Sequence, residues 1–168
     1  AEVVVRGPRQ LEALLGRELA ALGLEAQQPF VGGVLGTADV ATAIRLCFAS
    51  RLASRVLWPL ARFPAPDADA LHAGVAALPW AELVRPGVTL AVGFDGTSRT
   101  LRHTRFAAQR VKDGVVDALR EARGERPSVD LVDPDLRLQA VLFRDRVTLY
   151  LDLAGTALHR RGWRREGG

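Results

Sequence analysis

The sequence predicts an α+β fold in two lobes, because strand-like and helix-like apolar spacings alternate along it. In the first part of the chain, short runs typical of strands surround two stretches of helical periodicity. The second part contains the longest helical stretch and ends in two strongly alternating runs. With 168 residues, 48% of them hydrophobic and 25% charged, the chain can bury a core as one ordinary domain or two small ones.

The first lobe is predicted to begin with a short strand and a helix. Residues 2–6 form a β-rich run, and Pro8 is suited to opening a helix that Gly23 ends. Leucines at helical spacing are expected to form the buried stripe of this helix, namely Leu11, Leu14, Leu15, Leu19 and Leu22.

Two strands, a second helix and a further strand are expected to complete the first lobe. Residues 24–30 and 33–36 predict strands around a glycine pair, and residues 54–60 predict the last strand. Thr37 or Asp39 is expected to cap the helix between them. The predicted inner face of this helix consists of Val40, Ala43, Ile44 and Cys47. The resulting order, βαββαβ, is that of a ferredoxin-like fold.

The second lobe is predicted to follow a proline-rich joint at residues 63–66. Residues 67–78 have helical spacing, and residues 89–94 alternate as a strand. Residues 104–123 form the longest predicted helix. These elements make the second lobe a mixture of helices and strands.

Two alternating runs are predicted to close the second lobe as an antiparallel hairpin. Residues 136–143 and 146–153 alternate strongly, and only Arg144 and Asp145 separate them. A two-residue connection between alternating runs is typical of a hairpin. The last dozen or so residues have little power to form a core, so we interpret them as a linker.

Positive charge is concentrated in two stretches of the chain. The formal net charge is +4, and arginine supplies nearly all of the cations. Residues 97–112 carry five cations and no carboxylate, and residues 158–165 form a second basic stretch. Guanidinium groups bind phosphate through paired hydrogen bonds and also stack on bases. These stretches predict contact with nucleic acid, and the plain alternative is a solvated arginine face.

The first basic stretch places several candidate contacts on one predicted loop and helix. Residues i, i+4 and i+7 of a helix lie along one edge, which is the spacing of Arg105, Gln109 and Lys112. Phe106 is interleaved with the cations and can stack on an exposed base. The candidates in this stretch are Arg99, Arg102, His103, Arg105, Gln109 and Lys112. The second stretch, with Arg160 and Arg161, is either a phosphate-contacting linker or a solubilising tail.

The sequence contains no pattern that predicts catalysis, a cofactor or a metal. It has no P-loop, no glycine-rich dinucleotide fingerprint and no nucleophile elbow. Its three histidines lie in separate segments without cysteine partners, which argues against a metal site. Asp133 and Asp135 flank a proline and favour a turn over acid–base catalysis. Cys47 lies in an apolar stretch and favours core packing over a nucleophile.

The number of cysteines and the length of the apolar runs bear on the cellular compartment of the protein. Because Cys47 is the only cysteine, an intrachain disulfide is excluded and a reducing, cytoplasmic location is expected. The sequence has no apolar run of membrane-spanning length and no signal-peptide h-region. It lacks methionine even at position 1, so we expect a processed chain or a piece of a longer one.

Several stretches together resemble one family over essentially the whole chain. They are SRLASR at 50–55, VKDGVVD at 111–117, DPD at 133–135, LDLAG at 151–155 and LHRRGWR at 158–164. Together they resemble the N-terminal part of the RlmL-type 23S rRNA guanine-N2 methyltransferases. The last stretch is the strongest, because it resembles the lead into the methyltransferase domain of that family.

The resemblance implies a domain organisation and a role. It implies a ferredoxin-like domain over residues 1–61, a THUMP domain over 62–155 and a linker over 156–168. Such a region is expected to recognise structured 23S rRNA and present it to a catalytic domain that binds S-adenosylmethionine. No matching catalytic motif occurs in these 168 residues, so we expect no cofactor and no enzyme activity in this chain alone. The resemblance adds Arg51 and Arg55 as candidate RNA contacts and also implies such a role for Lys112.

Two other interpretations of the sequence remain open. A THUMP module can also serve a tRNA-modifying enzyme, either within the same chain or as an adaptor. Alternatively, a ferredoxin-like module with basic surfaces can regulate or assemble proteins by meeting an acidic partner. Comparing tRNA, rRNA and protein binding distinguishes these classes.

Overall fold

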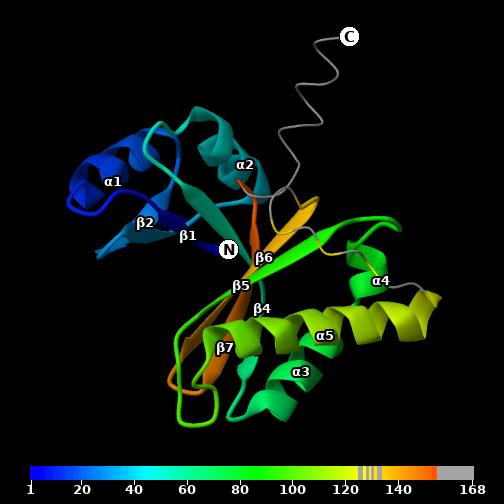
Figure 1. Cartoon of the computed structure of the whole chain (residues 1–168). Helices are drawn as coiled ribbons and strands as arrows, with labels where there is room; N and C mark the ends of the chain where they lie inside the picture. The colour runs from blue at the N-terminus through cyan, green and yellow to red at the C-terminus, as the bar shows by residue number, and fades with distance from the viewer. Residues whose placement is uncertain (125–126, 128, 130, 132–133, 155–168) are drawn as a thin grey trace. The chain divides into compact units, whose positions relative to one another are not determined.

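The structure is a computed structural model that describes residues 1–124, 127, 129, 131 and 134–154. The chain forms two compact units. The first contains Ala1–Pro59 and the chain from Leu151 onward, and the second contains Leu60–Tyr150. The chain therefore passes between units inside two strands, β4 (Arg55–Pro64) and β7 (Arg146–Asp152) (Figure 1).

The first unit has the predicted βαββαβ order. Besides β4, its elements are β1 (Glu2–Arg6), α1 (Glu12–Ala21), β2 (Glu25–Phe30), β3 (Gly33–Thr37) and α2 (Val40–Ala49). The strands are arranged β2-β3-β1-β4, and β1 pairs antiparallel with both β3 and β4. Leu19 of α1 and Leu46 of α2 share a buried core with Val5 of β1, so both helices cover one face of this sheet. The ferredoxin-like prediction is confirmed.

The first helix begins later than the sequence predicted. Gln10 has a φ of +72°, which breaks the right-handed path, and α1 starts only at Glu12. Leu15 and Leu19 are fully buried, but Leu11 and Leu14 are 41% and 46% exposed. The expected stripe of five leucines was therefore too wide. Gly23, at φ +108°, ends the helical segment as predicted.

The second helix is capped as predicted, but its buried face differs from the expected one. The Asp39 carboxylate accepts a hydrogen bond from the Thr42 backbone N–H at 2.7 Å. The buried residues are Ala43 and Leu46, whereas Val40 is 56% exposed. The sequence could not show which side of α2 faces the core, because this helix is apolar on almost every side.

The second unit combines a four-strand arrangement with three helices among its described residues. Besides parts of β4 and β7, its elements are α3 (Ala68–Ala76), α4 (Trp80–Leu83), β5 (Leu90–Asp95), α5 (Thr104–Arg123) and β6 (Leu136–Phe143). Its strands are arranged β4-β7-β6-β5. β5 and β6 are parallel, and α5 provides the long connection that a parallel pair requires. As the last strand in this order, β5 forms an edge of the sheet.

Helices α3 and α5 pack closely through a glycine. A Cβ atom on Gly114 of α5 would lie 2.9 Å from the Val75 side chain of α3 and 3.0 Å from the His72 carbonyl oxygen. Trp80 is buried beside them, and its indole N–H donates to the Val75 carbonyl oxygen at 2.7 Å. Leu71 and Val75 are the buried residues of α3. Because this face of α5 is held against α3, the opposite face of α5 is the one that points away from α3.

The hairpin prediction is confirmed. β6 and β7 are neighbours, and the two residues between them, Arg144 and Asp145, have φ values of +49° and +59°. Positive φ at both central residues is the signature of a type I′ turn.

Strand β4 is longer than expected. It continues to Pro64, through the start of the predicted joint at 63–66. Pro64 is the last residue of the strand, where its missing N–H removes no interior ladder bond. The predicted linker, 156–168, lies outside the described residues. In the part of the chain that the structure describes, no helix is long and apolar enough to cross a membrane.

Candidate nucleic-acid interface

The candidate site is an open pocket between the edge strand β5 and helix α5. Its volume is about 590 Å³. Its lining consists of four β5 residues, five residues of α5 and two from the segment before β6, namely Ala91, Val92, Gly93, Phe94, Thr104, Arg105, Ala108, Gln109, Lys112, Val129 and Leu131. The strand side is apolar, and the long polar side chains come from α5. A groove that combines cations with an apolar surface can accommodate a nucleotide chain.

The three residues predicted to share one edge of the long helix all line this pocket. They are Arg105, Gln109 and Lys112, and the helix has the predicted bounds of 104–123. Among the described residues, no carboxylate lies within ion-pair distance of Arg105 or Lys112. The Gln109 side-chain amide donates to Asp113 Oδ1 at 3.0 Å. The pocket therefore carries two cations that the described part of the protein leaves without a counter-charge.

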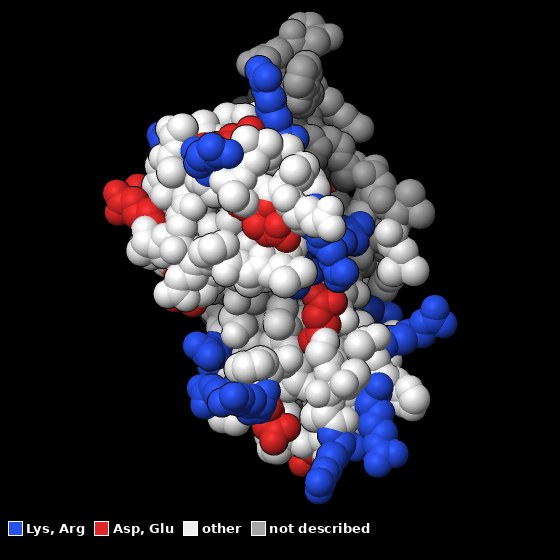
Figure 2. All heavy atoms as spheres, turned by 90° about the vertical axis from the view of Figure 1, so that its left-hand side faces the viewer, with Lys and Arg blue, Asp and Glu red and all other residues white. Residues whose placement is uncertain are grey.

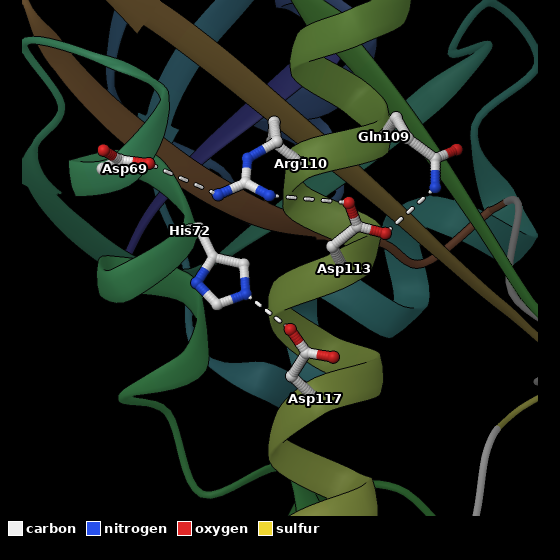
Figure 3. A network of polar contacts seen from close by, with 6 residues as sticks. All are labelled: Asp69, His72, Gln109, Arg110, Asp113 and Asp117. Carbon is white, nitrogen blue, oxygen red and sulfur yellow. Dashed lines mark hydrogen bonds and ion pairs between the residues drawn. The ribbon is translucent and has the colours of Figure 1, made fainter.

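Two carboxylates of α5, Asp113 and Asp117, belong to a polar network that reaches α3 (Figure 3). Arg110 forms ion pairs of 3.7 Å with Asp69 and with Asp113, and His72 Nε2 lies 2.8 Å from Asp117 Oδ2. One of the five cations in the 97–112 stretch is thus neutralised. The i+3 spacing of Asp113 was visible in the sequence, but Asp69 is distant in sequence and only the fold brings it near.

The loop before α5 holds Arg99, Arg102 and His103 at the surface. All three residues are exposed. The buried Leu101 anchors the loop, and its backbone N–H donates to Ser98 Oγ at 3.1 Å. Arg102 Nε donates to the Arg99 carbonyl oxygen at 3.0 Å. Figure 2 shows Lys and Arg side chains projecting in the lower part of the view, with Asp and Glu side chains among them.

The two candidates of the first unit have different local roles. Arg51 is exposed in the segment between α2 and β4, and its backbone N–H donates to Glu18 Oε1 at 3.0 Å. Arg55 Nη1 lies 3.6 Å from Asp152 Oδ2, and the Asp152 side chain is only 2% exposed. Arg55 is therefore already engaged by a buried carboxylate, so a structural role competes with phosphate contact. Both residues belong to a different unit from the pocket.

Some of the predicted site residues lie outside the described residues, and the sequence analysis missed one group of surface cations. Arg160 and Arg161 lie outside the described residues, and so does Asp133, in a separate gap before β6. The β6–β7 turn exposes Arg144 and Arg146, which the sequence analysis treated only as part of a hairpin. The signal for Arg144 was an arginine at a turn position that favours asparagine or glycine.

Cys47 packs partly buried against the core of the first unit. Burial raises the pKa of the Cys47 thiol to about 12, with a further contribution from the negative charge of Asp152. Such a thiol stays protonated near neutral pH and is a poor nucleophile. Among the described residues, no group of three or more His, Cys, Asp or Glu side chains is placed to hold a metal ion.

Comparison with known proteins identifies the family. The family model of the THUMP domain matches residues 65–152, more than half of the chain. The chain belongs to the THUMP domain family. The model of the RlmL ferredoxin-like domain matches residues 2–57, so the ferredoxin-like unit precedes the THUMP domain as the sequence predicted. The predicted resemblance to the RlmL-type methyltransferases is confirmed.

One curated relative matches almost all of this THUMP-containing chain. It is ribosomal RNA large subunit methyltransferase K/L from Pseudomonas syringae pv. tomato, 46% identical over 167 residues. The match covers 99% of this chain and 22% of that relative, so the chain spans about a fifth of its length.

Two solved structures share the fold. A protein described as a predicted N6-adenine-specific DNA methylase from Listeria monocytogenes is 25% identical, with a TM-score of 0.72 over 90% of this chain and 40% of that one. A 4-thiouridine synthetase–RNA complex with bound ATP is 12% identical, with a TM-score of 0.55 over 90% of this chain and 40% of that one. The second likeness shows the fold alone.

Proposed function

We propose that this THUMP region binds structured RNA, chiefly through contacts between its cations and phosphates. The observation that carries the proposal is the pocket beside β5, where Arg105 and Lys112 have no counter-charge among the described residues. Two cations about two turns apart on one helix edge can bind successive phosphates of one strand. The apolar lining from β5 and from Val129 and Leu131 gives a base a surface on which to pack.

The relative's name bears on which RNA this region binds and which enzyme modifies that RNA. The relative's name, ribosomal RNA large subunit methyltransferase, supports large-subunit rRNA as the target. We propose that the chain recognises 23S rRNA and presents it to a guanine-N2 methyltransferase domain in cis. S-adenosylmethionine is expected to bind that domain rather than these 168 residues, and the chain alone is expected to transfer no methyl group. The proposed setting is the cytoplasm.

A charge-matched pair of double variants tests the proposed phosphate contacts. Arg105→Ala with Lys112→Ala removes the two pocket cations, and Arg85→Ala with Arg120→Ala removes two exposed arginines elsewhere in the same unit. Each charged hydrogen bond contributes about 1.5 kcal/mol or more, so we expect the pocket variant to weaken RNA binding at least roughly tenfold. The control variant should bind nearly as the unchanged chain does.

The same variants separate binding from folding. Because the described residues form no ion pair with Arg105 or Lys112, the pocket variant should keep its melting temperature. Fluorescence anisotropy with a 23S rRNA hairpin measures binding, and tRNA serves as the competing substrate class. Equal weakening by both double variants would contradict the pocket and indicate a general effect of net charge. A lower melting temperature with intact RNA binding would assign the two residues to the fold.

A further inference from the structure

The tip of the β6–β7 hairpin exposes an aromatic ring together with cations. The Phe143 side chain is 66% exposed, more than the other exposed phenylalanines of the chain, Phe30, Phe48 and Phe106. The guanidinium carbon of Arg144 lies 5.2 Å from the centre of the Phe143 ring, within the range of a cation–π contact. Arg146 is also exposed at the start of β7. The tip thus presents a stacked ring and guanidinium to solvent.

Arg144 occupies a strained backbone conformation in this turn. Arg144 has a φ of +49°, in the left-handed region that disfavours residues with a bulky side chain. Asparagine or glycine suits the first central position of a type I′ turn better. Asp145, at φ +59°, is better tolerated in this region. An outlier of this kind suggests that the side chain of Arg144 serves a purpose other than folding.

Hydrogen bonds place this turn beside the basic loop that precedes α5. The Ala65 backbone N–H donates to the Asp145 carbonyl oxygen at 2.8 Å, and Thr100 Oγ1 donates to the carbonyl oxygen of the next residue, Pro66. Two consecutive residues therefore connect to the turn and to the loop. Figure 1 shows the two segments close together at the lower left of the view. We call this surface the basic end, formed by Arg99, Arg102, Phe143, Arg144 and Arg146.

The basic end is cationic in spite of two nearby carboxylates. Asp67 caps α3 by accepting from the Ala70 backbone N–H at 2.8 Å, and Asp145 lies in the turn itself. Within the described chain, none of the four arginines forms an ion pair. Four cations against two carboxylates leave a net positive surface around an exposed ring. Phosphates complement the cations, and a base complements the ring, so nucleic acid fits both.

We propose that the basic end is a second RNA contact of this chain, distinct from the pocket beside β5. An unpaired base stacks on the Phe143–Arg144 pair, and Arg146 with the loop arginines binds the flanking phosphates. The inference rests on the proposed RNA-binding function and adds a preference for single-stranded nucleotides. A paired duplex offers no free base face for the ring and would use only the arginines.

Two single variants test the ring and the strained arginine. Phe143→Ala removes the stacking surface, and Phe48→Ala, at a phenylalanine that is 57% exposed in the other unit, is its matched control. Arg144→Asn places a residue that tolerates positive φ in the turn and removes the charge. The ligands are an RNA hairpin with an unpaired loop and a fully paired RNA of equal length, both titrated by fluorescence anisotropy.

The two tip variants are expected to differ in their effect on RNA binding, and Arg144→Asn is also expected to change the melting temperature. Phe143→Ala should weaken binding to the looped RNA about fivefold or more and leave paired RNA almost unchanged. Arg144→Asn should weaken binding to both RNAs while raising the melting temperature, because the strain is relieved. Phe48→Ala should change neither affinity.

Three results separate this inference from the proposed function. If both tip variants bind like the unchanged chain while Arg105→Ala with Lys112→Ala weakens binding, the basic end is not an RNA contact and the proposed function stands. If the unchanged chain binds neither RNA, the proposed function fails and this inference fails with it. If Phe143→Ala weakens looped and paired RNA equally, base stacking is the wrong explanation of the exposed ring.

Discussion

Glu18 organises the segment that carries Arg51. Its carboxylate accepts hydrogen bonds from the Ser50 hydroxyl and from the backbone N–H groups of Arg51 and Leu52, at 3.0 and 3.2 Å for the two N–H groups. The Ser50 bond makes the largest contribution to lowering the pKa of Glu18, and the two N–H groups and the Arg51 charge add to it. One carboxylate from α1 thereby fixes the backbone after α2.

Acid should weaken this arrangement in a defined direction. Because the pKa of Glu18 is lower in the folded chain than in the unfolded one, its stabilisation is complete above the ordinary glutamate pKa of about 4.3. That stabilisation is lost as the pH falls through the lowered folded value. In Glu18→Gln the side chain keeps an acceptor but no longer titrates. The melting temperature of the unchanged chain should therefore fall more steeply between pH 6 and pH 3 than that of the variant.

Parallel melting curves check the prediction for Glu18. Glu12 and Asp39 also have lowered pKa values, so both proteins should lose stability in acid and only the difference between them reports on Glu18. Identical slopes for the two proteins would show that the three hydrogen bonds do not favour the charged carboxylate.

At the scale of single residues, helical spacing placed the candidate contacts of α5 correctly, whereas the count of charges did not show which cations lack a partner. The spacing of Arg105, Gln109 and Lys112 placed all three in one pocket, because the periodicity of a helix fixes its edges. The absence of acids in the 97–112 stretch did not leave every cation free. Arg110 meets Asp69 of α3, a pairing that depends on packing between elements distant in sequence.

At the scale of elements, the packing of α3 on α5 depends on Gly114. Gly114→Ala would place a methyl group 2.9 Å from the Val75 side chain, closer than normal contact allows. Overpacking costs about 1–3 kcal/mol, whereas the gain in helix propensity is no more than about 1 kcal/mol. We expect a net loss of stability and a melting temperature several degrees lower.

A surface change on the same helix controls for this effect. Arg120→Ala alters an exposed residue of α5 and should leave the melting temperature nearly unchanged. Thermal unfolding followed by circular dichroism measures both variants. A Gly114→Ala protein that melts at or above the temperature of the unchanged chain would show that α3 and α5 separate easily.

Element types were predictable from the sequence, whereas the ends and faces of α1 and α2 were less so. Helix α5 and the β6–β7 hairpin have strong periodicity, and the structure has them where the sequence placed them. Helix α1 starts later because the backbone of Gln10 is left-handed. A glutamine in the sequence does not predict that conformation. The buried face of α2 was predicted only in part, with Ala43 buried and Val40 exposed, because its apolar residues cover almost all sides.

At the scale of the whole molecule, the proposed RNA binding rests on cations carried by both units. The THUMP match covers 65–152 and the ferredoxin-like match 2–57, so candidate contacts lie in both domains. The pocket cations and the basic end belong to the second unit, and Arg51 belongs to the first. The family could be predicted from several short stretches together, because their order and spacing extend along the whole chain.

The most direct test of this account is the salt dependence of RNA affinity. Fluorescence anisotropy of this chain with a 23S rRNA hairpin at 100 mM and 200 mM salt measures it. Each phosphate that a cation neutralises releases counterions, so about four such contacts should weaken binding roughly tenfold when the salt is doubled. That result would support cation–phosphate contacts as the basis of recognition. An affinity that does not change between the two salt concentrations would contradict the account.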